Sequence, residues 1–383
     1  MGPLILCLNT GSSSLKCTLY IQSDLTIFLS GAIEEIGEKK GLFWVKDGKG
    51  EKQTEERDSF ATYLDAVQKL FHFLDPFKTQ LTAIGHRVVH GGSVYLQPTL
   101  LDDKVLSILE ELVPLAPLHL PQELEVIKES RRLFPGVDQV LCFDTSFFRA
   151  MPESARRFAL PKSFWEEKVE RYGFHGLSYE YITSKLEPMP SKAIIAHLGN
   201  GASLAAIREG KPIDTSMGFS PAGGVIMGSR LGDIDPGVLI YLLREKKMDA
   251  DKLEELVYKK SGLLALSDLT GDMQTLLQEK KEFAIEMFCQ SVAKVIGSYV
   301  VVLEGLDQLI FTGGIGERAD EIRKRICEKL KPLGAQLDVQ KNKEHAVNIS
   351  LSQSAFTIKV IATDENYKIA SHVVRSLHHV RSK

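Results

Sequence analysis

The chain has 383 residues with 47 basic and 50 acidic side chains, a formal net charge of −3 and 44% hydrophobic residues. These are average values for a globular protein, and at about 150 residues per domain the length predicts two or three domains. The charge balance argues against a dedicated nucleic-acid binder, which would carry a basic excess, so we expect a small partner and no nucleic acid.

We expect no membrane partner and a cytoplasmic location. No apolar run approaches the roughly 18 residues needed to span a bilayer. The N-terminal apolar stretch lacks a preceding basic region and runs into a Gly/Ser turn, which predicts a first strand rather than a signal peptide. The five cysteines are odd in number and widely spaced, without a CxxC pair, which predicts reduced thiols.

Strand-like and helical patterns alternate along the first part of the chain. The expected elements are strands at 4–9, 15–21 and 25–33, a helix at 59–75, a strand at 82–89, helices at 102–112 and 122–133, and a strand at 138–143. We place a domain boundary near 145–150, just after the last of these strands.

A second cycle begins near residue 192, where a strand, a Gly-rich turn and a strand recur. Gly11 in the first turn and Gly201 in the second lie about half a chain length apart, which predicts a duplicated domain rather than a short solenoid repeat. The expected elements that follow are helical regions at 235–260 and 276–304, a strand at 308–311, a Gly-rich break at 313–316, a strand at 355–363 and a helix at 366–377.

Three Gly-rich segments, each after a strand-like run, are candidate phosphate-binding turns: residues 9–16, 197–203 and 312–317. Glycine permits close backbone approach, and successive N–H groups in such turns form concave anion sites. Any one alone is more often a hairpin or a helix cap. Three together, two of them at matching positions of a duplicated unit, favour binding of a polyphosphate. The pattern GxxxxGK[ST] does not occur, which excludes the common P-loop.

Several charged residues lie in apolar or Gly-rich surroundings. An isolated arginine at a strand end is usually a salt-bridged surface residue, and an isolated histidine among aromatic residues usually belongs to the core. Several of them flanked by Gly and Pro favour a cleft with preset loops. The residues in question are Arg87, His119, Asp144, His175, Arg230 and Asp233.

These segments closely resemble those of the acetate kinase family, in order and over nearly the whole chain. The matching segments are 9–16 (NTGSSSLK), 85–92 (GHRVVHGG), 143–147 (FDTSF), 171–176 (RYGFHG), 197–203 (HLGNGAS), 214–221 (DTSMGFSP), 227–236 (MGSRLGDIDP) and 311–317 (FTGGIGE). The resemblance implies an α/β fold of two duplicated ribonuclease-H-like, actin-like ATPase domains with an interdomain active-site cleft. It implies a first domain of residues 1–148 with the C-terminal helix 367–383, and a second domain, 149–366, that binds nucleotide and forms a homodimer.

The implied reaction is reversible, direct in-line transfer of the γ-phosphoryl group of ATP to acetate. Acetate is an anion at pH 7, because a carboxyl pKa is roughly 4–5, so it attacks without a general base. The obstacle is repulsion by the phosphate, about 4 kcal/mol for two unit charges 4 Å apart at an effective dielectric constant of 20. Catalysis then rests on positive charge and alignment, which explains why cations dominate the candidates.

The resemblance also assigns roles to individual residues. The catalytic set is Arg87, which orients acetate, Arg230, which neutralises the phosphoryl oxygens, His175, which donates a hydrogen bond to the transferring group, and Asp144. Mg²⁺, or alternatively Mn²⁺, is held by Asn9, Asp144 and Glu365. The acetate site is Arg87, Val89, Leu118, His119, Phe174 and Pro221. The nucleotide site is Asn9, Ser12, Ser14, Lys16, His197, Gly199, Asn200, Gly201, Asp272, Met273, Gln274, Gly313, Gly314, Ile315 and Gly316.

The chain departs from the family pattern at several positions. Leu120 replaces an asparagine, Tyr179 replaces a histidine, and Asn366 stands where the family has a second glutamate, which leaves Glu365 as the remaining ligand candidate. Gln274 replaces an arginine near the adenine, which removes a planar cation and leaves nucleotide preference open. Gly223 also replaces a glutamate, but the phosphoryl-transfer set is intact.

Two alternatives remain at this point. A propionate or other short-chain acyl kinase would share the same chemistry, since a small apolar pocket discriminates by only about 1–3 kcal/mol per methylene. A non-catalytic nucleotide-binding or chaperone-like member of the fold would not need Arg87 and Arg230. The apolar stretch 285–306 is a candidate dimer interface.

Overall fold

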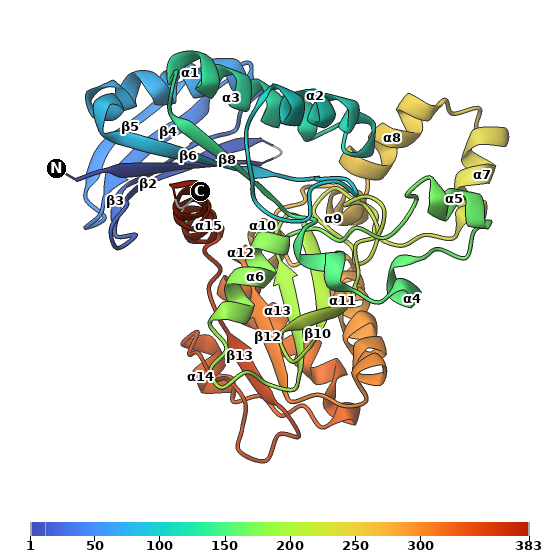
Figure 1. Ribbon diagram of the computed structural model, residues 1–383. Coiled ribbons are helices and arrows are strands. Elements are labelled where there is room, and N and C mark those ends of the chain that lie inside the picture. Colours follow the sequence, from blue (N-terminus) through green and yellow to red (C-terminus); the bar gives the residue numbers. More distant parts are fainter. Residues whose placement is uncertain (1, 12, 382–383) are drawn as a thin grey trace. The chain divides into compact units, whose positions relative to one another are not determined.

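The structure is a computed structural model that describes residues 2–11 and 13–381 (Figure 1). The chain divides into two compact units. Unit 1 comprises Met1–Phe147 and Asp364–Lys383, and unit 2 comprises Phe148–Thr363. The sequence prediction put the first division at 148/149 and the second at 366/367.

Unit 1 is built on an eight-stranded mixed sheet in the order β5-β4-β3-β2-β1-β6-β8-β7. Its strands are β1 (Leu4–Thr10), β2 (Ser14–Ile21), β3 (Ile27–Glu34), β4 (Gly41–Asp47), β5 (Lys52–Asp58), β6 (Leu81–Val88), β7 (Thr99–Leu100) and β8 (Asp138–Phe143). Strand β1 is antiparallel to β2 and parallel to β6, and β6 is parallel to β8. The carboxyl ends of β1, β6 and β8 therefore meet at one edge of the sheet.

Helices cover this sheet. They are α1 (Tyr63–Leu74), α2 (Asp103–Glu111), α3 (Leu120–Leu133) and the C-terminal α15 (Glu365–Arg381). A capping box of Thr62 and Asp65 starts α1, whose apolar side is buried in the unit 1 core. Helix α15 packs on β1, β6 and β8 (Figure 1). A Cβ at Gly85 of β6 would lie 2.4 Å from Ile369, so the missing side chain lets α15 approach the sheet.

Unit 2 repeats the same topology in a five-stranded sheet, β11-β10-β9-β12-β13. Its strands are β9 (Lys192–Leu198), β10 (Ala202–Arg208), β11 (Lys211–Thr215), β12 (Gln308–Thr312) and β13 (Thr357–Val360). Strands β9, β10 and β11 form an antiparallel meander, and β12 and β13 extend it in parallel. This matches β3-β2-β1-β6-β8 strand for strand, which confirms the predicted duplication.

The helices of unit 2 mostly lie between these strands in sequence. They are α4 (Glu153–Arg156), α5 (Lys162–Glu166), α6 (Gly176–Ser184), α7 (Pro236–Arg244), α8 (Ala250–Lys259), α9 (Gly262–Ser267), α10 (Met273–Gln278), α11 (Glu282–Leu303), α12 (Gly313–Arg318), α13 (Asp320–Lys329) and α14 (Val339–Lys343). The expected Gly-rich break at 313–316 is the first turn of helix α12, and the strand expected at 355–363 is confined to β13.

One helix of the described residues bears on the expectation about membrane spans. By length and composition alone, α11 is sufficient to cross a bilayer, with 22 residues and a mean hydropathy of 1.4. The core helix of a globular domain passes the same test, and α11 packs against α13 and β10 with Phe288, Val292 and Ile296 fully buried. The sequence estimate missed it because charged residues such as Lys294 interrupt the apolar run.

Candidate functional site

The central contact of unit 1 joins Arg87 and Asp144. Arg87 is the next-to-last residue of β6, and Asp144 follows the parallel strand β8, so both emerge at the same edge of the sheet. The Arg87 guanidinium donates to Asp144 Oδ2 from Nε at 3.0 Å and from Nη2 at 2.6 Å. Its Nη1 donates to the carbonyl of Thr10, at the end of β1, at 2.9 Å. The fold thus orients this cation through three adjacent strands.

Arg87 remains charged in this setting. Burial lowers the pKa of its guanidinium, but Asp144, Glu365 and Glu123 together raise it further, so the net pKa lies above the ordinary value. The side chain of Asp144 is fully buried and that of Arg87 is 11% exposed. A desolvated, always-protonated guanidinium is well suited to binding a carboxylate or phosphate.

The predicted metal ligands all lie in unit 1. Asn9 Nδ2 donates to Glu365 Oε2 at 2.7 Å, which ties the end of β1 to the start of α15. Glu365 and Asp144 both act electrostatically on Arg87. Among the described residues no group of three or more His, Cys, Asp or Glu side chains forms a ready-made metal site. Two carboxylates and an amide nevertheless fit Mg²⁺, which prefers oxygen ligands and usually keeps waters and substrate phosphates in its shell.

The first Gly-rich segment forms the β1–β2 turn. The Gly11 N–H donates to Ser14 O at 2.8 Å, and Tyr63 Oη donates to Gly11 O at 2.5 Å. Because Tyr63 belongs to α1, this helix holds the turn in place. Ser14 is half-buried, whereas Lys16 is exposed on β2. Ser12, also predicted to bind nucleotide, lies outside the described residues.

Unit 2 holds a second set of groups around His175. This residue caps α6 with a left-handed backbone, φ 60° and ψ 27°, a conformation that costs a non-glycine residue roughly 1–3 kcal/mol. Its ring stacks on His197 with centroids 4.4 Å apart. His175 Nδ1 pairs with Ser203 Oγ at 2.9 Å, and Ser203 Oγ also contacts Tyr179 Oη at 2.6 Å. The ring is therefore fixed in both tilt and rotation.

Gly201 lies between the two predicted phosphoryl-binding side chains. A Cβ at this position would lie 3.3 Å from His175 Nε2 and 3.4 Å from Arg230 Nη1. Arg230 Nη1 also donates to the carbonyl of Pro221 at 3.1 Å. The structure therefore brings His175 and Arg230 together over the turn between β9 and β10, as a phosphoryl group in transfer would require.

The second and third Gly-rich segments are neighbours, because β9 and β12 are parallel and their carboxyl ends coincide. A Cβ on Gly313 would lie 2.8 Å from Leu198 O, and its φ is 76°, so only glycine fits this point. Glu317 caps α12 by accepting from Gly313 N at 2.9 Å and from Thr363 N at 3.0 Å. Beneath the helix, fully buried Arg323 donates to Gly316 O and Glu317 O.

A cavity of about 370 Å³ opens beside these segments in unit 2. Its lining residues are Asn200, Gly228, Ser229, Leu264, Thr270, Gly271, Asp272, Met273 and Ile315. Four of them were predicted nucleotide contacts: Asn200, Asp272, Met273 and Ile315. Asp272 also caps α10 by accepting from Thr275 N at 2.8 Å. Gln274 does not line this cavity. The predicted effect on nucleotide preference of having Gln274 in place of an arginine therefore has no direct contact to support it.

The predicted acetate residues divide between the units. Val89 and His119 are buried and Leu118 is half-buried in unit 1, while Phe174 and Pro221 are buried in unit 2. A joint acetate pocket of these residues stays a prediction.

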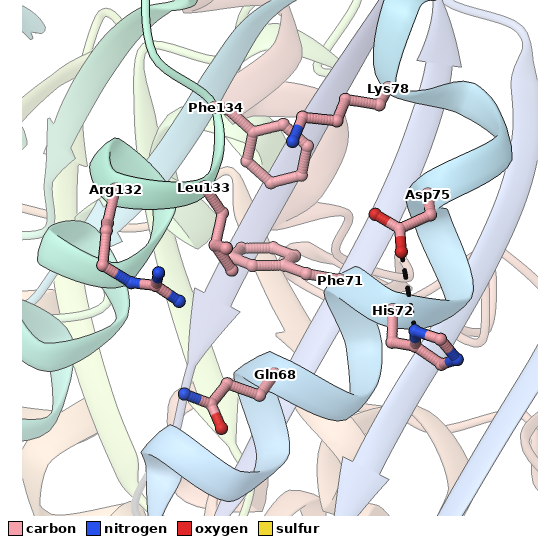
Figure 2. A pocket seen from close by; sticks show the side chains of 8 residues that line it. All are labelled: Gln68, Phe71, His72, Asp75, Lys78, Arg132, Leu133 and Phe134. Atoms are coloured by element: carbon pink, nitrogen blue, oxygen red, sulfur yellow. Dashed lines mark ion pairs between the residues drawn. The ribbon is translucent and has the colours of Figure 1, made fainter.

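A second cavity, of about 210 Å³ in unit 1, contains none of the predicted residues (Figure 2). Phe71 and Phe134 meet edge to face in it, and Lys78 lies over the Phe134 ring. Within the unit, His72 Nδ1 lies 3.5 Å from Asp75 Oδ2 (Figure 2), and Arg132 pairs with Glu129. Nothing in this lining points to phosphate chemistry.

Comparisons with known proteins show the family of this chain. A sequence model of the acetokinase family matches residues 4–371. The chain belongs to the acetokinase family. An acetate kinase from Methylocella silvestris is 40% identical over 400 residues, covering 98% of each chain.

Solved acetokinase structures share the fold as well. A propionate kinase from Francisella tularensis superposes with a TM-score of 0.90 at 36% identity, covering 97% of this chain and 98% of that one. An acetate kinase from Porphyromonas gingivalis gives 0.85 at 34% identity, covering 98% and 100%. The predicted duplicated α/β fold is thus confirmed.

Sequence reasoning missed the residues that hold these side chains in place. Ser203 and Glu317 lie inside the motifs that resemble the family, so their position was a usable signal. Glu123, Arg323 and Tyr179 gave none. Glu123 binds Val89 across 34 residues and Arg323 binds Asn342 across 19, and Tyr179 replaces a family histidine.

Proposed function

We propose that this enzyme transfers the γ-phosphoryl group of ATP to acetate, giving acetyl phosphate and ADP, and runs in reverse when metabolite levels favour it. The observation that carries the proposal is the approach of both His175 Nε2 and Arg230 Nη1 to Gly201. Asn200, the neighbouring residue, lines the cavity that we assign to the nucleoside. The phosphate chain of a nucleotide seated there would run toward His175 and Arg230.

The acceptor is held by Arg87. Because acetate is already an anion, the residues need only orient it and neutralise charge. The contacts with Asp144 and Thr10 use three of the five N–H groups of the guanidinium, leaving one on each of Nη1 and Nη2 for an incoming carboxylate. Arg230 and His175 then stabilise the charge that develops on the phosphoryl oxygens in an in-line transfer.

Mg²⁺ is the metal we expect, with Mn²⁺ as an alternative. Asn9, Asp144 and Glu365 would hold it directly or through water. When bound, such an ion neutralises phosphate charge and orients the polyphosphate.

Acetate is our first choice of acid, and propionate the alternative. The relatives named above include both an acetate kinase and a propionate kinase at similar identity, so a name alone does not decide. The buried side chains of Val89 and Phe174 favour a small methyl pocket. Comparison of kcat/KM for acetate, propionate and butyrate tests this choice, and a preference for propionate would overturn it.

We further propose a cytoplasmic homodimer. The proposed interface includes α11, which exposes large apolar side chains near both ends: Phe283 is 68% and Val301 77% exposed. Exposed apolar groups of this size favour burial against a second protein surface. Sedimentation at micromolar concentration should give twice the chain mass, and Phe283→Glu should shift it toward monomer. The interdomain cleft expected from the family stays a prediction.

The direct test of the function is trapping with hydroxylamine. The wild-type protein with ATP, Mg²⁺ and acetate should form acyl hydroxamate well above a blank without enzyme. A nucleotide-binding protein without kinase activity would give only the blank.

A further inference from the structure

Glu123 is a buried carboxylate outside the predicted site. It lies in the first turn of α3 with a relative exposure of 1%. Its Oε2 accepts a hydrogen bond from the backbone N–H of Val89 at 2.9 Å. Its Oε1 lies 4.0 Å from Arg87 Nη1, an ion-pair distance, and has no hydrogen-bond partner within residues 2–11 and 13–381.

This placement is costly for the fold. A buried carboxylate destabilises a protein unless hydrogen bonds and a counterion satisfy it, and here one oxygen has only a long ion pair. Burial raises the pKa of Glu123 to about 8, even though Arg87 and the Val89 N–H both lower it. An apolar side chain at this position of α3 would avoid the cost, so the carboxylate calls for a functional explanation.

Glu123 lies beside Arg87 and Val89, the two residues that we assign to binding the carboxylic acid substrate. Asp144 binds the Nε and Nη2 groups of Arg87, while Glu123 faces Nη1. Val89, held through its backbone N–H, is the first residue after β6 and a predicted wall of the methyl pocket. One side chain from α3 thereby sets the relative position of the cation that binds the carboxylate and the wall that contacts the methyl group.

We propose that Glu123 is a positioning residue for the carboxylic acid substrate, which fixes the Nη1 side of Arg87 and the backbone of Val89. This inference rests on the proposed function, because it uses the acid-binding roles of Arg87 and Val89. Because Glu123 acts through Arg87 and Val89, it affects binding of the acid and leaves ATP binding and the phosphoryl-transfer groups of unit 2 unchanged.

The test compares three variants by separate KM values for acetate and ATP. Glu123→Ala removes the acceptor for Val89 N–H and should raise the acetate KM about tenfold, as expected for one buried hydrogen bond, with the ATP KM within twofold of wild type. Glu123→Gln keeps an acceptor oxygen at the same reach and should restore most of the affinity for acetate. Glu129→Gln, on the same helix and paired with Arg132, is the matched control and should behave as wild type.

The outcomes separate the two proposals. If wild-type protein forms no acyl phosphate, the proposed function fails and this inference falls with it. If wild type is active and Glu123→Ala leaves the acetate KM unchanged, or raises both KM values equally, the positioning role alone is wrong. If Glu123→Ala does not fold by circular dichroism, Glu123→Asp, which retracts the carboxylate by one methylene, must show the same selective rise in acetate KM.

Discussion

Arg87 and Asp144 share two hydrogen bonds on a single oxygen: Nε and Nη2 of the guanidinium both donate to Oδ2, at 3.0 and 2.6 Å. The pair bridges the ends of two parallel strands and is almost completely buried. Because both charged groups are removed from water, each relies on the other to offset the free-energy cost of its desolvation.

Removing the charge of Asp144 should therefore disable acid binding. We expect Asp144→Asn to lower kcat/KM for acetate at least about 100-fold, because breaking one partner of a buried ion pair costs roughly 3 kcal/mol or more. Asp103→Asn is the matched control, since Asp103 pairs with Arg131 at the surface and is 90% exposed. Kinetics of Asp144→Asn within a few-fold of wild type would contradict the role of the pair.

Ser203 should matter for turnover rather than for binding. It holds the His175 ring through Nδ1, so Ser203→Ala would let the ring rotate away from the position over Gly201. We expect kcat to fall about tenfold, within the range that a lost hydrogen bond at a catalytic group produces, with the ATP KM little changed. Steady-state kinetics measure this, and an unchanged kcat would show that Ser203 does not orient the histidine.

Gly228 keeps the proposed nucleoside cavity open. A Cβ at this position would lie 1.9 Å from Asn200 Oδ1, so Gly228→Ala must displace Asn200 from the lining. The ATP KM should rise about tenfold while the acetate KM stays near wild type, since a misplaced contact of this kind is worth 1–2 kcal/mol.

Gly297→Ala is the control for Gly228→Ala. Its Cβ would meet nothing within 4 Å, and it lies in the middle of α11, where alanine stabilises a helix by about 1 kcal/mol over glycine. Equal effects of the two variants on the ATP KM would rule out the cavity as the nucleoside site.

His86 should make the protein sensitive to acid. Burial lowers the pKa of His86 to about 4, partly opposed by the hydrogen bond with Gln139 that raises it. Between pH 6.5 and 4 the unfolded chain binds a proton that the native protein excludes, so the free energy of unfolding falls as pH falls, by roughly 3 kcal/mol at most.

Urea unfolding across this pH range measures the effect. His86→Gln should flatten the loss of stability between pH 6.5 and 4. His72→Gln, which removes a side chain that is 86% exposed, is the matched control and should follow wild type. An equally steep loss in His86→Gln would show that other groups carry the acid sensitivity.

Sequence reasoning worked best where patterns are local. Short apolar runs located β1, β2, β6, β8, β9 and β10, and the repeated turns at Gly11 and Gly201 revealed the duplication. Strand β5 was not expected, because its sequence KQTEERD is almost entirely exposed at the sheet edge and has no apolar side. The Gly-rich segment at 313–316 was taken for a turn, since helix propensity is low for glycine, yet Glu317 and Arg323 stabilise it as α12.

The supporting residues of the site could not be found this way. Glu123 contacts Val89 and Arg87 across more than 30 residues, and Ser203 reaches His175 across 28. Such contacts depend on how strands and helices pack, and a single sequence shows neither packing nor burial. The residues that we expect to contact substrate were named by resemblance, whereas those that hold them in place became visible only in the folded units.

The most direct test of the account is the kcat of Arg230→Ala in acetyl phosphate formation. Because this guanidinium lies with His175 over Gly201, where charge develops on the phosphoryl group, its loss should lower kcat by about 10²–10³ with a smaller change in either KM. A kcat close to that of wild type would contradict the account.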